Sequence, residues 1–332
     1  MNALHDWLQR VWFKEARGGW VLAPLTLIYA LLSFVRRLSY QSGLRATIRV
    51  SCPVIVVGNL SVGGTGKTPL SIALAQGLTR RGMRVGIISR GYGGTSRGPE
   101  RVKADTSPFV VGDEAVVMAR RTLCPVVVAR ERVAAARHLA RDVDVLISDD
   151  GLQHLRLARD FEIVVVDGAR RFGNGKLLPQ GPLREPVSRL ASVNALVMNG
   201  AGAVGAGEIA MRLTVDSLVV LQTGAQLPVT ALQGKRVHAV AGIGCPERFF
   251  DSLRSLGMDV IEHPLRDHVI LRAKDLQFGD DLPVVMTEKD AVKCGSFAAP
   301  NQYFLSVSAS LDAVPGEQLL DTLEALVRRP RS

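Results

Sequence analysis

Short, mainly apolar runs alternate with amphipathic stretches along most of this chain. Six such runs lie in the first 200 residues, at 54–58, 84–90, 125–129, 143–149, 161–167 and 195–199. Apolar runs of this length, without polar alternation, are typical of strands buried on both faces of a parallel sheet. Helices are predicted between them, starting near 70 and at 115–122 and 130–139. This order predicts an α/β fold in which helices wrap a parallel sheet.

The clearest chemical signal lies where the first run meets the helix that follows it. Residues 54–70 read VIVVGNLSVGGTGKTPL, a strand and a glycine-rich loop ending in Gly-Lys-Thr, although Ser61 stands where this pattern usually has its first glycine. Glycine lets backbone N–H groups turn toward an anion, and the helix adds the positive end of its dipole. Lys67 would reach the β- and γ-phosphates, and the Thr68 hydroxyl would bind Mg²⁺. The predicted phosphate-binding loop consists of Gly63, Gly64, Thr65 and Gly66.

Two adjacent carboxylates end another predicted strand. Residues 143–151 read VDVLISDDG, so an apolar run delivers Asp149 and Asp150 to its C-terminal end. Parallel α/β sheets bind their ligands at the carboxyl ends of the strands. Carboxylate oxygens are also the donors that Mg²⁺ prefers. We therefore predict that Asp149 or Asp150 holds Mg²⁺, directly or through water.

A second, smaller α/β unit is predicted to begin near residue 229. A strand at 237–241 leads into a Gly-X-Gly turn at 242–244, a helix follows at 247–256, and 283–287 forms another strand. The chain is therefore expected to have three parts: an N-terminal apolar helix at 1–38, a P-loop domain at 39–228 and a smaller C-terminal α/β domain at 229–332.

The N-terminal region carries an apolar segment of a different kind. Residues 18–35 read GGWVLAPLTLIYALLSFV, without a charge, and Arg36 and Arg37 follow at once. This length is at the lower limit for crossing a bilayer, and Pro24 interrupts the segment early. Arginines beside an apolar segment with Trp20 are typical of helices held at a membrane interface. Three interpretations are open: a single span, a helix lying in the interface, or a buried amphipathic helix of a soluble enzyme.

Charge and cysteine content narrow the classes of partner. The 332-residue chain has a formal net charge of +10, which favours an acidic lipid surface, nucleic acid or a phosphorylated substrate. Aromatic residues make up only 5%, and no basic run interleaves with them, which argues against a single-stranded nucleic-acid binder. The four scattered cysteines have no paired metal spacing, which favours reduced thiols in a cytosolic compartment.

The combined motifs resemble the tetraacyldisaccharide 4′-kinases, the lipid A kinases of Gram-negative bacteria. The matching pieces are VGNLSVGGTGKTPL, SRGYGG, VGDEA, DDGLQH, FGNGKLLPQGPLREP, GIGCPERFF, RDH and MTEKDAVKC. The resemblance implies a P-loop kinase that uses ATP and Mg²⁺ to phosphorylate the 4′-hydroxyl of a tetraacylated glucosamine disaccharide 1-phosphate, giving lipid IVA. It would take this lipid and no nucleic acid. It would act at the cytoplasmic face of the inner membrane, bound peripherally or by a single N-terminal anchor.

The resemblance also implies roles for single residues. In the family, a glutamate at the position of Glu185 lies at the metal, and Gln153 lines the site. An aspartate of the GDE motif pairs with a histidine of the DH motif to activate the sugar hydroxyl, which implies a base formed by Asp113 and His268. The carboxylate of such a pair orients the ring, which suits general base chemistry. From the residues alone, Asp113 would only offset the positive dipole end of a helix, and His268 would be an ordinary surface histidine.

Three further side chains complete the expected site. Phosphoryl transfer needs positioning and charge neutralisation more than covalent help. Arg130 is therefore predicted to neutralise the transferring phosphoryl group, and Arg184 is the second candidate, in contact with the nucleotide. Tyr92 is expected to pack on the nucleotide.

The chain departs from the family pattern at two positions, and two other classes of protein compete. Val269 stands where a second histidine commonly follows the DH motif, and Cys245 stands where asparagine is common. The runner-up is a P-loop GTPase or ATPase that acts as a regulatory protein or metallochaperone. However, the chain has no Asn-Lys-X-Asp motif or cysteine cluster, and Val62 replaces the signature lysine of dimeric ATPases. A nucleic-acid-binding ATPase rests on the charge alone.

Overall fold

The computed structural model describes residues 3–14, 18–202 and 204–329 of the chain. Its strands are β1 (Val54–Gly58), β2 (Val85–Ser89), β3 (Glu100–Val102), β4 (Val126–Val128), β5 (Val145–Asp149), β6 (Phe161–Asp167), β7 (Ala195–Asn199), β8 (Glu208–Val220), β9 (Gln226–Leu227), β10 (Arg236–Ala241), β11 (Asp259–Pro264), β12 (Val284–Thr287) and β13 (Gln302–Leu311). Its α-helices are α1 (Ala3–Phe13), α2 (Ala23–Gln41), α3 (Lys67–Arg80), α4 (Pro108–Val111), α5 (Asp113–Thr122), α6 (Arg132–Leu139), α7 (Pro246–Ser255), α8 (Glu288–Ala291) and α9 (Ala313–Arg328).

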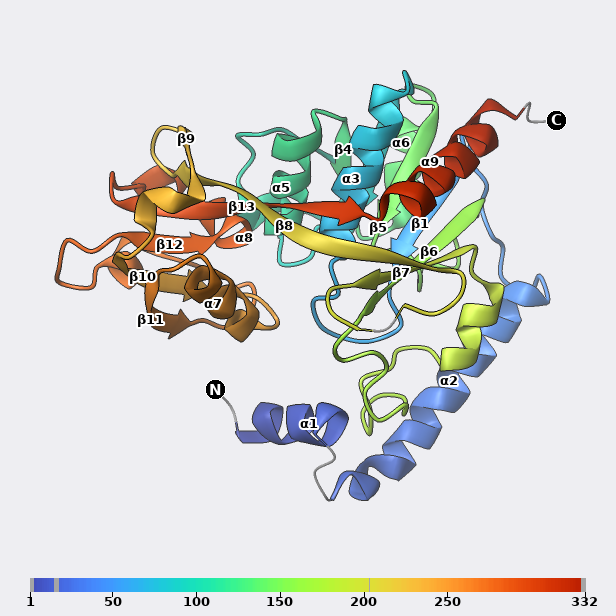
Figure 1. The fold of residues 1–332 in the computed structure, drawn as a ribbon. Coiled ribbons are helices and arrows are strands. Elements are labelled where there is room, and N and C mark those ends of the chain that lie inside the picture. Colours follow the sequence, from blue (N-terminus) through green and yellow to red (C-terminus); the bar gives the residue numbers. More distant parts are fainter. Residues whose placement is uncertain (1–2, 15–17, 203, 330–332) are drawn as a thin grey trace.

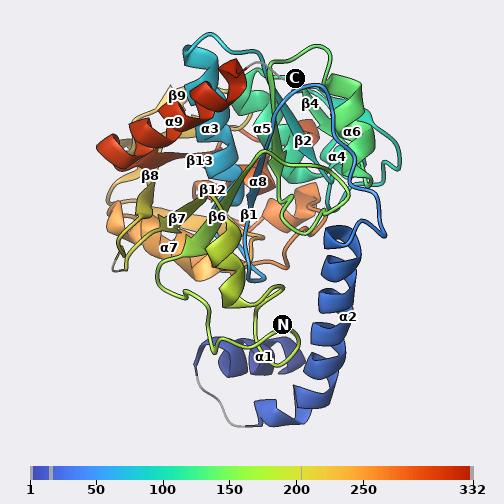
Figure 2. The same cartoon turned by 90° about the vertical axis from the view of Figure 1, so that its right-hand side faces the viewer.

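Within the described residues, thirteen strands form one sheet that extends across both halves of the molecule (Figure 1). The strand order is β11-β10-β12-β13-β8-β7-β6-β1-β5-β2-β4-β3, and β9 pairs with β8 beside this path. Most neighbours are parallel, and helices cover both faces of the part that contains β1 (Figure 2). The predicted α/β fold, a largely parallel sheet wrapped by helices, is confirmed.

The strand before the glycine-rich loop lies inside the sheet, with neighbours on both sides. β1 pairs in parallel with β5 on one side and with β6 on the other. Parallel neighbours end at the same edge of a sheet. That edge therefore gathers the loop after β1, the Asp149–Asp150 pair after β5, and Asp167 at the end of β6.

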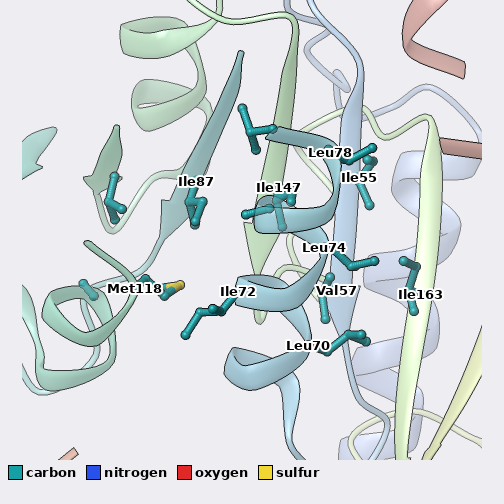
Figure 3. Packing of buried hydrophobic residues seen from close by; sticks show 14 of the residues in the cluster. Ile55, Val57, Leu70, Ile72, Leu74, Leu78, Ile87, Met118, Ile147 and Ile163 are labelled. Atoms are coloured by element: carbon teal, nitrogen blue, oxygen red, sulfur yellow. The ribbon is translucent and has the colours of Figure 1, made fainter. Parts of the chain in front are cut away.

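Alternate side chains of β1 belong to two different apolar clusters. Ile55 and Val57 face α3 and pack with its Leu70 and Leu74 (Figure 3). Val54 and Val56 point to the opposite face and pack in a second cluster with residues of α6. Because both faces of the strand and one face of α3 are buried, the loop between them has two fixed ends.

The two halves of the sheet join through β8 and β13. These strands pair antiparallel from Tyr303 to Leu311, with a bulge between Ser306 and Val307. After β13 the chain returns to the first half, where α9 packs on α3 and Asp321 lies 2.7 Å from Arg81. Residues 313–328, which the sequence assigns to the C-terminal unit, therefore pack on the first half. The division at 38 and 228 stays a prediction.

Several elements of the fold are not marked in the sequence by an apolar run. Among them are β8, β11, β13 and α9. Buried, half-buried and exposed residues mix along β8 and β13, and β11 has only half-buried and exposed residues, because these strands are partly open to solvent. In addition, α6 begins at Arg132 and not at 130, because the Glu131 carboxylate caps it by accepting from the Val133 amide.

The helix α2 extends away from the body of the molecule, with α1 near its N-terminal end (Figures 1 and 2). None of its residues is buried, and Leu27, Leu31 and Phe34 are all more than 60% exposed. A core helix would bury its apolar face, so the interpretation as a buried amphipathic helix is wrong for α2. Among the described residues, Gly19–Gln41 is the one helical segment long and apolar enough to cross a membrane.

Candidate functional site

A cavity of about 550 Å³ lies between the two halves of the molecule. The loop residues Gly63 to Gly66 line one side of it, and α3 begins directly after them at Lys67. Gly66 has a φ of 93°, and a Cβ there would lie 2.5 Å from Nδ2 of Asn199, so the position requires glycine. The Thr65 hydroxyl is buried without a hydrogen-bond partner in the part of the chain described. The loop thus offers an anion a helix N-terminus and a hydroxyl that no protein group uses.

Lys67 faces the carboxylate that follows β5. Its Nζ lies 3.6 Å from Oδ1 of Asp150, and Nη1 of Arg184 approaches the same oxygen at 3.3 Å. Asp150 has a φ of 46°, which is uncommon for any residue except glycine and is frequent at functional sites. Burial disfavours the charged carboxylate, but Lys67 and Arg184 outweigh burial and hold the pKa of Asp150 below its usual range. All three side chains line the cavity.

Asp149 ends β5 and is buried beneath the loop. Its carboxylate accepts hydrogen bonds from Oγ of Ser71 at 2.7 Å and from Oγ1 of Thr68 at 3.2 Å. Burial raises the pKa of Asp149 to about 6, because water cannot solvate its charge there. The buried Arg132 donates to the backbone carbonyl of Asp149 at 3.0 Å and so fixes the end of the strand.

The oxygen atoms around Lys67 suit a magnesium ion. The Thr68 hydroxyl and the carboxylates of Asp149 and Asp150 are hard donors, and a cation would stabilise the charge on buried Asp149. Within the described ranges, no three His, Cys, Asp or Glu side chains form a metal cage. Mg²⁺ in phosphoryl-transfer sites takes one or two carboxylates and completes its shell with phosphate and water. The predicted donors therefore fit this ion.

Glu185 and Gln153 lie behind this group, and neither is among the described residues that line the cavity. Nε2 of Gln153 donates to Oε1 of Glu185 at 2.9 Å, and Nη1 of Arg184 donates to Oε1 of Gln153 at 3.4 Å. The helix α2 holds the same segment. Its Tyr29 hydroxyl donates to the Arg184 carbonyl at 2.9 Å, and its Arg36 donates to the Gln153 carbonyl at 2.9 Å. The sequence does not predict this link between α2 and the site.

Asp113 and His268 meet across the two halves of the molecule. Oδ2 of Asp113, at the start of α5, lies 3.2 Å from Nδ1 of His268, which follows β11. Burial disfavours the charged form of Asp113, but the hydrogen bond with His268 and the nearby Lys289 and Lys293 hold its pKa below the usual range. His268 has a φ of 57°, a conformation that side chains other than glycine adopt at a cost. His268 lines the same cavity as Lys67.

Two lysines flank this pair, and the sequence analysis assigned neither of them. Nζ of Lys293 lies 3.4 Å from Oδ2 of Asp113. Nζ of Lys289 contacts three groups: Nε2 of His268 at 3.3 Å, Oδ1 of Asp267 at 3.1 Å and Oε1 of Glu114 at 3.2 Å. The motif MTEKDAVKC contains both lysines. Their contacts with residues 113 and 268 depend on tertiary structure, which no spacing within the motif reveals.

Tyr92 and Arg130 differ in their placement. Tyr92 lines the cavity and packs edge-on against His268, with ring centroids 4.7 Å apart. Arg130 is exposed and is not among the described residues that line the cavity. Its role in neutralising the phosphoryl group stays a prediction.

A further ion pair at the cavity joins the two halves. Arg248 of α7 lines the cavity, and its Nη1 and Nη2 lie 2.6 Å and 2.8 Å from the two carboxylate oxygens of Asp167. Asp167 ends β6, the neighbour of β1. The sequence analysis missed this pair as well. The available signal was an aspartate directly after a buried run, in the same position as Asp149 on β5.

Three comparisons with known proteins agree with this arrangement. The chain matches the sequence model of the family described as tetraacyldisaccharide-1-P 4′-kinase over residues 19–326. It is 47% identical to the tetraacyldisaccharide 4′-kinase of Nitrosococcus oceani, with 99% of this chain and 98% of that protein covered. The enzyme of the same name from Methylobacillus flagellatus is 46% identical, and the match covers 97% of this chain and 97% of that protein. The enzyme from Aeromonas hydrophila is 49% identical, and the match covers 95% of this chain and 94% of that protein.

A solved structure also resembles the fold. It is LpxK from Aquifex aeolicus in complex with ATP, 28% identical, with a TM-score of 0.79. The match covers 93% of this chain and 99% of the LpxK chain. The similarity therefore extends over both halves of the sheet and over the cavity between them.

Proposed function

The chain belongs to the tetraacyldisaccharide 4′-kinase family and has this kinase activity in lipid A biosynthesis, and we propose that it transfers the terminal phosphoryl group of Mg·ATP to the 4′-hydroxyl of a tetraacylated glucosamine disaccharide 1-phosphate. The product is lipid IVA. The family identity that the motifs predicted is thereby confirmed.

One observation supports the proposal most strongly. A phosphate-binding loop with Lys67 and a carboxylate–imidazole pair with His268 open on the same cavity, one from each half of the molecule. A kinase needs these two elements close together, because the nucleotide and the accepting hydroxyl must meet in line. The ATP complex of the Aquifex aeolicus relative supports ATP as the donor.

The loop and its surroundings would hold the nucleotide. Backbone N–H groups of residues 63–66 and the ammonium of Lys67 would bind the phosphates, and Arg184, with Gln153 behind it, would add positive charge. Thr68, Asp149, Asp150 and Glu185 would hold Mg²⁺, directly or through water. When bound, this ion neutralises charge that develops on the phosphate oxygens. Arg130 is kept as a further candidate for that role.

Asp113 and His268 would act on the accepting hydroxyl. The Asp113 carboxylate accepts a hydrogen bond from Nδ1–H of His268 and orients the ring, which leaves Nε2 to accept the hydroxyl proton. The O–H bond breaks as the oxygen attacks the terminal phosphorus, and ADP leaves. Tyr92 packs on the ring and limits its rotation. Because Asp113 and His268 belong to different halves, closing of the cleft would assemble this base.

The helix α2 would bring the site to its lipid. Its exposed apolar side chains suit the acyl region of a bilayer, and Arg36 and Arg37 suit phosphate headgroups. We therefore place the enzyme at the cytoplasmic face of the inner membrane, bound peripherally or by a single span. Tyr29 and Arg36 would then hold the segment 153–185 at a fixed height above the membrane.

A transfer assay tests the proposal directly. The full-length protein is incubated with γ-labelled ATP, Mg²⁺ and the monophosphorylated tetraacyl disaccharide, and the lipids are separated by thin-layer chromatography. Label should move to a lipid with two phosphate groups, and His268→Ala should strongly slow the transfer while ATP still binds. ATP hydrolysis without any labelled lipid would contradict the proposal and favour a regulatory ATPase.

A further inference from the structure

The ring of His268 has a hydrogen-bonding partner at each nitrogen. Nδ1 faces the carboxylate of Asp113 at 3.2 Å, and Nε2 faces the ammonium of Lys289 at 3.3 Å. An ammonium can only donate a hydrogen bond, and a carboxylate can only accept one. The two contacts therefore fix one neutral tautomer, with the proton on Nδ1 and the lone pair of Nε2 directed toward Lys289.

The charges around this ring come from three parts of the chain. The acidic groups are Asp113 and Glu114 on α5 and Asp267 beside the histidine, and the basic groups are Lys289 and Lys293 on the segment after β12. The uncharged ring of Tyr92 covers one side. Lys293 forms ion pairs with Asp113 and Asp290. Without Lys289, carboxylates would dominate around His268, and they would favour the imidazolium, which cannot accept a proton.

Lys289 is placed to act on the ring from the side on which the substrate must enter. It lines the cavity together with His268, and Glu114 and Asp267 hold its Nζ at 3.2 Å and 3.1 Å. Burial disfavours its charged form, but Glu114, Asp113 and Asp267 hold the pKa of Lys289 above its ordinary value. The side chain is therefore a fixed, permanently charged neighbour of Nε2.

We infer that Lys289 is a positioning residue of the kinase reaction, which keeps His268 neutral and occupies its Nε2 lone pair until the accepting hydroxyl takes that place. The inference rests on the proposed pairing of Asp113 and His268 as the base. Lys289 remains charged throughout: it gives up one hydrogen bond to Nε2 and keeps those to Glu114 and Asp267. The proton that the hydroxyl loses ends on Nε2 of His268.

The test compares Lys289→Met, Lys289→Arg and the native protein in kcat, KM for ATP and the pH dependence of both. Methionine keeps the length of the side chain and removes its charge. Lys289→Met should lower kcat about tenfold or more near neutral pH and move the acid limb of the kcat profile to higher pH by about one unit, the effect of one charge within 4–6 Å. KM for ATP should stay within about twofold. Lys289→Arg should keep the acid limb in its native position.

Two further measurements keep the result decisive. An NMR titration of the His268 ring in the full-length protein, assigned with His268→Ala, should show a higher midpoint in Lys289→Met, and this readout needs no turnover. The exposed Lys274, replaced by methionine, is the matched control and should leave both profiles unchanged. An unmoved acid limb and titration midpoint in Lys289→Met would overturn the inference, as would a raised KM for ATP as the main effect. If His268→Ala keeps native kcat, the paired base itself falls, and the inference with it.

Discussion

The carboxylate of Asp113 lies 3.2 Å from Nδ1 of His268, although 155 positions separate the two residues in the chain. One residue starts α5, which packs on α3, and the other follows an edge strand of the far half of the sheet. The contact therefore exists only because β8 and β13 join the two halves into one sheet. We propose that the base for phosphoryl transfer is formed across that junction.

Lys67→Ala should lower kcat by about a hundredfold or more. The substitution removes a positive charge that is fixed at the start of α3, where charge develops in the transition state. The exposed Lys176, replaced by alanine, serves as the control for loss of one charge. Steady-state kinetics of the folded variants, checked by circular dichroism, measures the effect. Native turnover in Lys67→Ala would show that Lys67 and its loop take no part in the reaction.

Asp149→Asn and Asp150→Asn should each raise the Mg²⁺ concentration required for half-maximal rate by about tenfold or more. Both carboxylates lie at the end of β5 near Thr68 and Lys67, and an amide is a weaker ligand for this ion. Glu185→Gln should have a smaller effect in the same direction, because Glu185 lies behind the cavity lining. Titration of rate against Mg²⁺ gives the comparison. If all three variants keep native metal dependence, the ion binds elsewhere.

The apolar face of α2 should govern membrane binding. Leu27, Leu31 and Phe34 are 71%, 62% and 63% exposed, and their spacing places them on one side of the helix. Each should contribute about 1.5 kcal/mol or more when buried in lipid. The triple glutamine variant should therefore lose most of its sedimentation with anionic vesicles. Val314→Gln and Leu123→Gln, exposed apolar positions elsewhere, are controls. Native sedimentation of the triple variant would show that another surface binds the membrane.

Protonation of His154 should destabilise the fold in mild acid. Burial, together with the nearby Arg132 and Arg90, lowers the pKa of His154 to about 4, whereas the unfolded chain titrates near pH 6.5. The unfolded state binds the additional proton between these values, so the free energy of unfolding should fall as pH falls from 6.5 to 4. Between pH 7.5 and 5 the loss should be on the order of 2 kcal/mol, because about 1.4 kcal/mol is lost for each pH unit below 6.5. Urea unfolding of native protein and His154→Phe at pH 7.5 and 5 should show a smaller loss in the variant, and equal losses would refute the assignment.

The strand, glycine-rich loop and helix start that contain Lys67 and Thr68 could be predicted from the sequence, because local physics determines them. The chain passes directly from a buried strand through a glycine-rich turn to a helix start, and this local order determines the positions of Lys67 and Thr68. Asp149 and Asp150 follow from the rule that parallel strands end at one edge. In the fold, Asp149 lies 3.2 Å from Thr68 and Asp150 lies 3.6 Å from Lys67, whereas their role at a metal ion stays a prediction.

The remaining parts depend on tertiary contacts that leave little local signal. β8 and β13 are partly open to solvent, so no apolar run identifies the strands that join the halves. Lys289 and Arg248 are charged residues on short segments, which a sequence pattern reads as solvent-exposed. Their partners, His268 and Asp167, lie on distant parts of the chain. The contact of Tyr29 with residue 184 likewise spans 155 positions.

A double-mutant cycle on kcat tests the paired base most directly. Asp113→Asn keeps the size of the side chain and an oxygen that can accept the hydrogen bond from the Glu114 amide, and His268→Ala removes the ring. Each should lower kcat by about a hundredfold while ATP binding survives. The kcat of the double variant should lie within about threefold of that of the less active single variant, because the two residues act as one unit. A double variant whose loss equals the product of the two single losses would contradict the paired base, as would near-native kcat in Asp113→Asn.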